Sequence, residues 1–456
     1  MILMQNSPPL YDQLPMIETV GPTLGNGREP ILYCLDSDES STLEPESSLS
    51  PHAKSADEDY IKSNVAFTLS VLPTTQPHDL LILDHTFTTM IPFLQWHQKI
   101  YRQLGLNPTH QLHFAPSKKF APLAQKLATQ AHLSTLSTIG FSYLQEQTFP
   151  NPEMLEISKK MNAKTSLPEL AKMYGFPIPP AKILPWHELS LPSLHSLGFP
   201  RQPVYLKIDG LGGGYNVKKI CTEQDLTAFM TTHQKKSPLI AAQQELPRDD
   251  IEREHIFTLY PDTVEYLYSS IQLTTASSWY GNLFEPNFSL HPSQRDSLEK
   301  AAHALRKEGY SHPKGFLAGF DSLMNDRELS IIEINARWLG SLPIYRLLKK
   351  LQIPSNRHIF FSYDDLFEEE ISLYQAFAEK HLLTPHNIEP FSWIPVSFSP
   401  YLTEHKHIIC FIVIGKLEAF QQEVRSIFSP HSFQRLDLSM EQIDSLGSQK
   451  SRGSIL

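Results

Sequence analysis

The sequence predicts an α/β protein of several domains, and three observations support this prediction. Its 456 residues exceed what a single hydrophobic core usually holds. Apolar strands and amphipathic helices alternate from Asp79 to Ala131, as they do in an open α/β layer. In the second half, short apolar runs are separated by polar turns, which is typical of antiparallel strand pairs and adds an α+β part.

Composition excludes several classes of protein. Hydrophobic residues make up 41% of the chain, which is ordinary for a globular protein. The net charge of −10 and the absence of a long basic run argue against nucleic acid as a partner. The three cysteines are too far apart for a disulfide framework or a metal site, so we expect a cytoplasmic location. The N-terminus lacks the apolar core of a signal peptide, and the longest apolar run, Ile408–Ile414, is too short to span a membrane.

The N-terminal part divides into two predicted regions. Residues 1–60 are rich in Pro, Ser, Asp and Glu, so we expect a largely flexible segment with one candidate strand at 31–35. Residues 61–160 are expected to form an α/β domain. Its strands are predicted at Leu80–Leu83 and Gln111–Phe114, and its helices at Phe93–Leu104 and Lys118–Ala131.

Residues 161–350 hold the motifs that carry chemistry. A short helix follows Lys164 and ends at Gly175, before a proline-rich stop. A strand with Lys207 at its middle then runs into a glycine-rich stretch made of Gly210, Gly212, Gly213 and Gly214. Glycines let backbone N–H groups approach phosphate oxygens, although a flexible glycine turn is the alternative. The spacing matches neither a P-loop nor a dinucleotide fingerprint.

A further strand, Leu239–Leu246, ends in the polar sequence Gln244-Glu245 before Leu246. Two strands around a turn at Pro261-Asp262 and a helix over Gln294–Glu308 follow. Several acids lie just after the strand Leu239–Leu246. They are candidates for a functional role, and the alternative is that they are solvated surface acids. They are Asp249, Asp250, Glu252 and Glu254.

The most informative stretch is the hairpin predicted at Phe316–Leu323 and Leu329–Ile334. A carboxylate within an apolar strand is costly unless it is paired or binds a cation. Asp321, Glu333 and Asn335 are therefore candidate ligands, and hard oxygen ligands suit Mg²⁺. Arg337 extends the same face with a forked donor for carboxylate or phosphate. A hairpin with chance acids is the alternative for this motif alone.

Residues 351–456 are expected to form a small C-terminal domain. A helix begins at Ser341, and Phe361, Asp364 and Asp365 are expected to open a second helical segment that ends at Leu382. Strands are predicted at Trp393–Val396 and Ile408–Ile414, an amphipathic helix at Lys416–Ile427, and a frayed end at 445–456.

The order of these motifs resembles the ATP-grasp superfamily. Its parts stand here as Lys164, Lys207, the glycine loop, the Gln-Glu-Leu strand end, Asp321, and the Glu-x-Asn-x-Arg sequence that begins at Glu333. The resemblance covers residues 162–348, and Ala163 departs mildly from the acid often found before the first lysine. The layout is most similar to the peptide ligases of the pheganomycin-type group, whose grasp region follows a pre-ATP-grasp domain.

The resemblance implies a carboxylate–amine ligase that uses ATP and Mg²⁺, with Mn²⁺ as an alternative metal. It places Lys164 and Lys207 at the nucleotide phosphates, under the glycine loop. Gln244, Glu245 and the backbone of Leu246 would hold the adenine, and Glu252 the ribose, with Asp249, Asp250 and Glu254 as competitors. Asp321, Glu333 and Asn335 would bind the metal. Arg337 would face the acyl phosphate or the substrate carboxylate and, with Lys207, is the catalytic candidate.

The resemblance implies two small-molecule substrates, a carboxylate and an amine, and favours amino acids or short peptides. A homodimer is compatible with the family.

Three alternatives to the ligase stay open. An ATP-grasp phosphotransferase would stop after phosphoryl transfer, a non-catalytic relative would hold nucleotide without turnover, and an unrelated α/β protein would not bind ATP.

Overall fold

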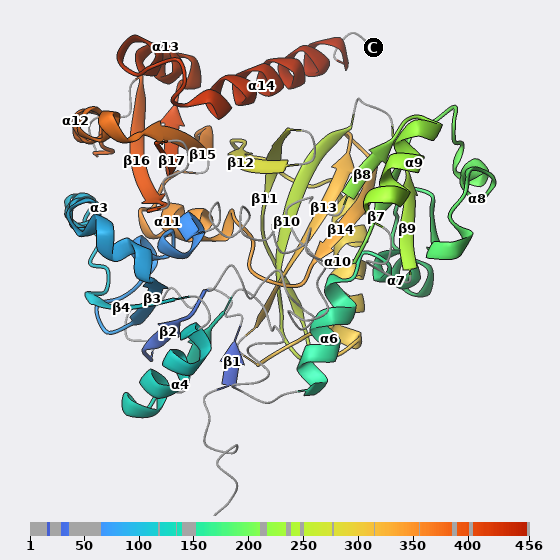
Figure 1. The fold of residues 1–456 in the computed structure, drawn as a ribbon, viewed down its shortest axis with the longest axis horizontal. Helices are drawn as coiled ribbons and strands as arrows, with labels where there is room; N and C mark the ends of the chain where they lie inside the picture. The colour runs from blue at the N-terminus through green and yellow to red at the C-terminus, as the bar shows by residue number, and fades with distance from the viewer. Residues whose placement is uncertain are drawn as a thin grey trace, which may run out of the picture.

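The computed structural model describes most of the chain (Figure 1). The described residues are 16–18, 29–35, 65–116, 119–133, 135–138, 152–209, 217–233, 239–246, 250–275, 278–313, 315–354, 356–384, 390–400 and 405–453. The glycine loop, Asp249 and most of the acidic N-terminal segment lie outside these ranges.

A five-stranded parallel sheet lies in the N-terminal region, in the order β1-β5-β2-β3-β4. Its strands are β1 (Met16–Glu18), β2 (Ile31–Tyr33), β3 (Leu80–Asp84), β4 (Gln111–Ala115) and β5 (Thr135–Ser137). The helices α3 (Ile91–Gln103) and α4 (Phe120–Gln130) follow β3 and β4. All five residues of β3 are buried, as expected for a central parallel strand covered on both faces. The predicted open α/β layer is thereby confirmed.

A separate four-stranded antiparallel sheet has the order β6-β9-β7-β8. It consists of β6 (Ala181–Pro185), β7 (Val204–Lys207), β8 (Val217–Ile220) and β9 (Leu239–Gln244). The helices α8 (Leu191–Leu194) and α9 (Glu223–Thr232) accompany it, and their apolar side chains share its core. The helices α6 (Pro152–Asn162) and α7 (Ser166–Tyr174) connect this lobe to the N-terminal region. Gly175 ends α7 with a φ of 73°, the left-handed conformation that the sequence predicts there.

The largest sheet has eight strands in the order β14-β13-β10-β11-β12-β15-β17-β16, and every neighbouring pair is antiparallel. Its first five strands in space are β14 (Leu329–Asn335), β13 (Phe316–Met324), β10 (Ile251–Leu259), β11 (Val264–Thr275) and β12 (Ser278–Phe284). The predicted hairpin of β13 and β14, and the two strands around Pro261, are confirmed.

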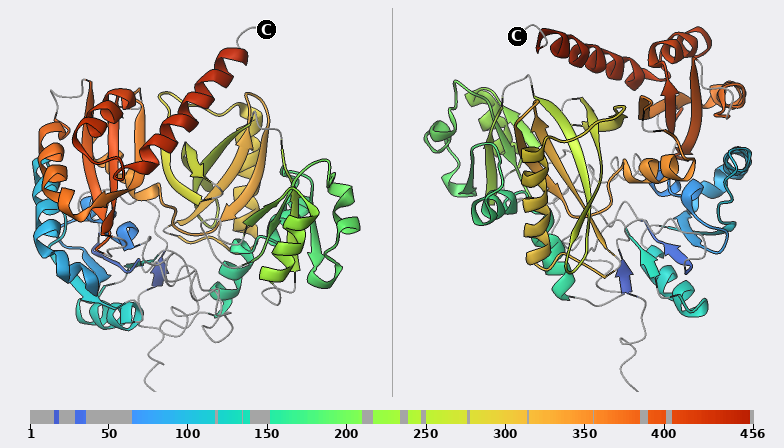
Figure 2. Two further views of the ribbon diagram at one scale, coloured as in Figure 1. Left: turned by 45° about the horizontal axis from the view of Figure 1, so that its top comes forward. Right: turned by 180° about the vertical axis from the view of Figure 1, so that it is seen from behind.

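The two faces of this sheet differ in polarity. On one face, Phe257 and Phe320 pack against Leu298 and Ala301 of helix α10 (Pro292–Lys307), which Figure 2 shows lying along the central strands. Because side chains alternate along a strand, the neighbouring polar residues of β10 and β13 point to the other face. That second face carries the candidate site.

The C-terminal strands β15 (Ile359–Phe367), β16 (Phe391–Phe398) and β17 (Lys406–Gly415) extend the same large sheet, because β15 pairs with β12. At this junction Gly281 lies so close to Phe361 that an added Cβ would be 2.2 Å from the Phe361 carbonyl oxygen. The helices here are α11 (Leu342–Lys350), α12 (Ile371–His381), α13 (Leu417–Ile427) and α14 (Gln434–Gly453).

One sequence prediction in this region is wrong. Residues 361–367 are a strand and not the start of a helix, because the aromatic residues of β15 are buried between β12 and β17 and favour extended backbone. Residues 445–453, where a frayed end is expected, continue the helix α14, which contacts β15 and β11. Among the residues that the structure describes, no helix has the length and apolar character needed to cross a bilayer.

Candidate active site

The hairpin β13–β14 places the three candidate metal ligands side by side. Asp321 is the register partner of Glu333, and Gly319 is the partner of Asn335. Asn335 Nδ2 donates a hydrogen bond of 2.9 Å to Asp321 Oδ2. Gln272 of β11 donates another, of 2.8 Å, to Asp321 Oδ1. Asn335 is buried, and its Oδ1 has no hydrogen-bond partner within the described structure.

Two lysines reach this hairpin from other elements. Lys164, in the turn between α6 and α7, forms an ion pair with Glu333 Oε1. Lys207, at the end of β7 in the four-stranded sheet, donates a hydrogen bond of 2.7 Å to the carbonyl oxygen of Ile332. Residues more than a hundred positions apart in the chain therefore meet where the two sheets face each other.

The charges at this point perturb one another. Burial lowers the pKa of Lys207 to about 8; the nearby Lys164 also lowers it, while Glu333 acts in the opposite direction. Burial alone would raise the pKa of Glu333, but Lys164 and Lys207 outweigh that effect and lower it. The pKa of Asp321 is raised well above its ordinary value, first by burial and then by Glu333, Glu254 and Glu252. The two lysines therefore favour the charged form of Glu333, whereas Lys164 offsets only part of the opposite effect on Asp321.

The donor set fits a hard divalent cation. Asp321, Glu333 and Asn335 offer only oxygen ligands, and the unpaired Oδ1 of Asn335 is a buried acceptor that a cation would satisfy. Within the described part of the chain, no three His, Cys, Asp or Glu side chains gather as a metal site. The candidate centre accordingly consists of two carboxylates and one amide oxygen.

Arg337 lies beside this centre in the segment after β14. Its Nη1 donates a hydrogen bond of 3.2 Å to Asn162 Oδ1, at the end of α6. The same oxygen accepts a bond of 3.0 Å from the backbone N–H of Ala336, so α6 holds this segment in place. The guanidinium acts electrostatically on both Glu333 and Glu254, lowering the pKa of each.

The strand end at Gln244, Glu245 and Leu246 lies at the four-stranded sheet. The carboxylate of Glu245 accepts a hydrogen bond of 2.5 Å from Lys219 and one of 3.4 Å from the Tyr205 hydroxyl. Glu252 is the second residue of β10, and burial raises its pKa. Of its competitors, Asp250 accepts a hydrogen bond of 3.2 Å from Asn325.

Gly210, Gly212, Gly213 and Gly214 lie outside the described residues, but the structure shows how their segment begins. Asp209 directly precedes them. Its Oδ1 accepts a hydrogen bond of 3.0 Å from Thr165 N, and its Oδ2 accepts one of 2.8 Å from Thr165 Oγ1. The start of the glycine-rich stretch is thereby tied to the residue that follows Lys164. Sequence reasoning missed this contact, because an aspartate before glycines looks like an ordinary turn residue.

The structure also shows a buried polar network around Glu254 that the sequence does not predict. Ser341 Oγ donates a hydrogen bond to Glu254 Oε2, and the Tyr268 hydroxyl lies 2.7 Å from Ser341 Oγ. Asn282 Nδ2 donates to Ser270 Oγ at 2.9 Å and reaches Glu254 Oε2 at 3.5 Å. Burial raises the pKa of Glu254 to about 7, while the Ser341 hydrogen bond and Arg337 act to lower it. These residues come from four elements, so no local signal links them.

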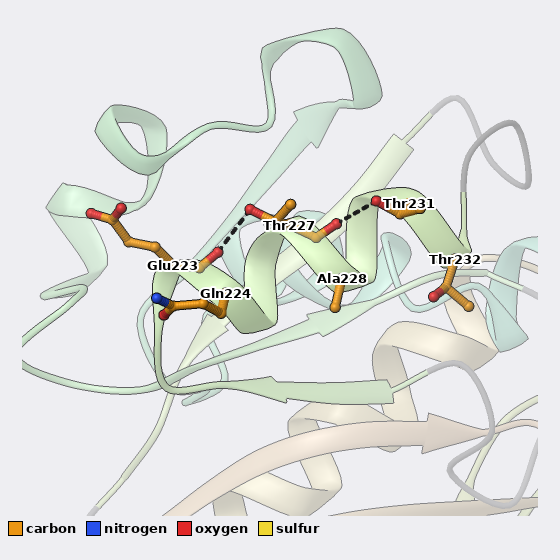
Figure 3. Close-up of a pocket in the computed structure, with 6 residues that line it drawn as sticks. All are labelled: Glu223, Gln224, Thr227, Ala228, Thr231 and Thr232. Atoms are coloured by element: carbon orange, nitrogen blue, oxygen red, sulfur yellow. Dashed lines mark hydrogen bonds between the residues drawn. The ribbon is translucent and has the colours of Figure 1, made fainter.

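A hollow of about 600 Å³ lies elsewhere, on the outer face of α9 (Figure 3). It is lined by Glu223, Gln224, Thr227, Ala228, Thr231 and Thr232. The hydroxyls of Thr227 and Thr231 donate to carbonyl oxygens of their own helix, at 3.0 and 2.8 Å. None of the candidate residues that the structure describes borders this hollow, so it is separate from the candidate site.

No protein-family model matches the sequence, and no curated protein does either. Solved structures do match its fold. The biotin carboxylase domain of the Hydrogenobacter thermophilus 2-oxoglutarate carboxylase, in complex with MgADP, ADP and bicarbonate, superimposes with a TM-score of 0.53 at 12% identity. That match covers 88% of this chain and 89% of the other.

Two further solved structures match the fold of this chain. A biotin carboxylase–β,γ-ATP complex from Campylobacter jejuni has a TM-score of 0.51 at 13% identity and covers 86% of this chain and 89% of the other. The Staphylococcus aureus N5-carboxyaminoimidazole synthetase, complexed with ADP, has a TM-score of 0.51 at 10% identity and covers 90% of this chain and 100% of the other. These proteins have the ATP-grasp fold, which confirms the predicted fold class.

Proposed function

From the ATP-grasp fold we propose that this chain is an ATP-dependent carboxylate–amine ligase. One observation carries the proposal: Lys164, Lys207 and Arg337 come from separate elements and surround the oxygen ligands at Asp321 and Glu333. Phosphoryl transfer depends mainly on positioned positive charge, and this arrangement supplies it. The solved structures that share the fold hold MgADP, ADP or an ATP ligand, which supports ATP as the substrate here.

In this proposal the nucleotide lies between the two antiparallel sheets. Lys164 and Lys207 bind the α- and β-phosphates, and the glycine-rich stretch covers them and excludes water. The adenine and ribose are held by residues at the end of β9 and the start of β10. They are Gln244, Glu245, the backbone of Leu246, and Glu252.

Asp321, Glu333 and Asn335 would hold Mg²⁺, or Mn²⁺ in its place. The metal would neutralise charge on the phosphate oxygens during transfer. The protein's own contribution is to fix the ligands: Gln272 and Asn335 each occupy one oxygen of Asp321. Lys164 forms an ion pair with Glu333 and offsets its charge.

The chemistry needs no nucleophilic side chain. A carboxylate oxygen of the substrate attacks the γ-phosphorus of ATP, ADP leaves, and an acyl phosphate forms. The amine nitrogen then attacks the acyl carbon. The C–O bond to phosphate breaks, the C–N bond forms, and the products are an amide, phosphate and a proton. Arg337 binds the phosphoryl or carboxylate oxygens through both steps.

The finer assignment concerns substrates. The order of the regions supports a peptide ligase of the pheganomycin-type group, which would join amino acids or short peptides. Bicarbonate is bound in one of the solved structures with this fold, so it is a second carboxylate to test.

The decisive experiment incubates the protein with MgATP, amino acids, short peptides and bicarbonate, and follows ADP release and product masses. We expect ATP-dependent products with the mass of two substrates minus water. A stable phosphorylated product would identify a phosphotransferase instead. ATP binding without turnover would favour a non-catalytic relative, and absence of ATP binding would refute the proposal.

Glu333→Gln should lower ADP release by about 100-fold or more, because it removes the charge of a metal ligand. The melting temperature reports whether the fold survives. Glu328→Gln changes an exposed acid in the turn of the same hairpin and should leave turnover unchanged. Wild-type turnover in Glu333→Gln would refute the assigned metal site.

A further inference from the structure

Glu254 is a buried carboxylate that the mechanism above does not use. It lies on β10 and is 4% exposed. Across the described residues, no lysine, arginine or histidine forms an ion pair with it, unlike Glu333, which pairs with Lys164. A buried carboxylate without a cation is costly, so its presence calls for an explanation.

The hydrogen bonds to the Glu254 carboxylate within the described structure all go to one of its two oxygens, Oε2. Ser341 and Asn282 both donate to Oε2, and no residue of the described structure donates to Oε1. The donors are themselves fixed, because Ser341 Oγ contacts the Tyr268 hydroxyl and Asn282 Oδ1 accepts a bond of 3.0 Å from Trp279 Nε1. The network therefore orients the carboxylate and leaves one oxygen for a ligand.

The position of Glu254 relates it to the candidate site. It is the register partner of Asp321 across β10 and β13, so both side chains point to the polar face of the large sheet. Arg337 acts electrostatically on both Glu254 and Glu333, so its guanidinium lies near both carboxylates. A ligand at Oε1 would thus lie next to the group that Arg337 binds.

The ligand that fits best at Glu254 Oε1 is a monovalent cation with hydrogen-bond donors. An anion would be repelled by Glu254 and Asp321, and among the described residues Glu254 belongs to no group of three His, Cys, Asp or Glu side chains that could hold a metal ion. An ammonium group carries one charge and three donors, and the carboxylate of Glu254 can accept from it. We infer that Glu254 binds the ammonium group of the amine substrate, such as an amino acid or peptide N-terminus. This inference rests on the proposed ligase function and deepens it.

A binding experiment tests the subsite without requiring turnover. The full chain is first titrated with MgADP, and then with glycinamide, a small cationic amine, or with N-acetylglycinamide, its uncharged counterpart. We expect the wild type to bind glycinamide and to bind N-acetylglycinamide at least about tenfold more weakly. Glu254→Gln keeps an oxygen for Ser341 and Asn282 but removes the charge, so it should lose the preference. Glu265→Gln changes an exposed acid of β11 and should retain it.

The outcomes separate the two proposals. Equal affinity of wild type and Glu254→Gln for glycinamide would overturn the subsite, as would absence of binding to the wild type. Failure to bind MgADP would count against the ligase itself, and the glycinamide titration of the free chain would still decide the role of Glu254. If Glu254→Gln does not fold, a crystal structure of the wild type with glycinamide replaces it. An ammonium nitrogen away from Oε1 would then refute the inference.

Discussion

At the scale of single residues, the acids and the arginine of the candidate site are held by polar partners from other elements. The glycines apart, most proposed site residues were selected because a charged or amide side chain stood within an apolar strand or at its end, which is a local signal. Their partners could not be predicted, because Gln272, Asn162 and Ser341 reach the site from distant parts of the chain. Nothing in the short sequence around any of these three marks it as a partner of an acid or an arginine.

Lys207 offers a test at this scale. Lys207→Ala should weaken MgATP binding at least about tenfold, because a charged contact to the phosphates is lost. Lys218→Ala changes an exposed lysine on the neighbouring strand and serves as the control. Isothermal titration of both variants measures the effect. Equal affinities would move the phosphate site away from Lys207.

At the scale of elements, the β13–β14 hairpin was predictable because its apolar runs and polar turn are contiguous. The strand β15 was mistaken for a helix start because two adjacent aspartates resemble an N-terminal turn. In the structure, Asp364 instead accepts hydrogen bonds from the backbone N–H groups of Arg435 and Leu436, at 3.1 and 2.8 Å. It caps α14, a helix some seventy residues away, and no local pattern reveals this long-range contact.

Asp364→Ala should therefore destabilise the protein by about 2 kcal/mol, since one buried and one partly buried N–H group of α14 lose their acceptor. Hydrogen exchange in the first turn of α14 should accelerate more than exchange elsewhere. Asp365→Ala changes the adjacent acid and provides the comparison. If α14 exchanges at the wild-type rate in Asp364→Ala, the proposed capping role is wrong.

At the scale of the whole molecule, one hydrophobic core joins the N-terminal and C-terminal regions. His97 of α3 lies within it, with its ring 5.1 Å from that of Phe398 on β16. Burial lowers the pKa of His97 to about 3. The folded state therefore binds fewer protons than the unfolded state between pH 6.5 and about 3, and stability falls as the pH drops through that window.

His97→Phe should flatten this dependence by up to about 1.4 kcal/mol per pH unit below about pH 6.5. Urea unfolding at about pH 7 and about pH 4.5 measures it. His255, whose pKa burial also lowers to about 3, keeps part of the dependence in the variant. His110→Gln, at an exposed position, should behave as the wild type. Identical slopes for His97→Phe and the wild type would contradict the prediction.

The junction between β12 and β15 has a practical consequence for shortened forms of this protein. The C-terminal strands continue the sheet that carries the candidate site, so they cannot be removed as an independent unit. Truncation before β15 would strip β12 of its neighbour and expose a row of unpaired backbone groups from Gly281 to Phe284. Such an edge is a template for association with other chains. A fragment cut there should aggregate, although it would retain every residue proposed to bind nucleotide and metal.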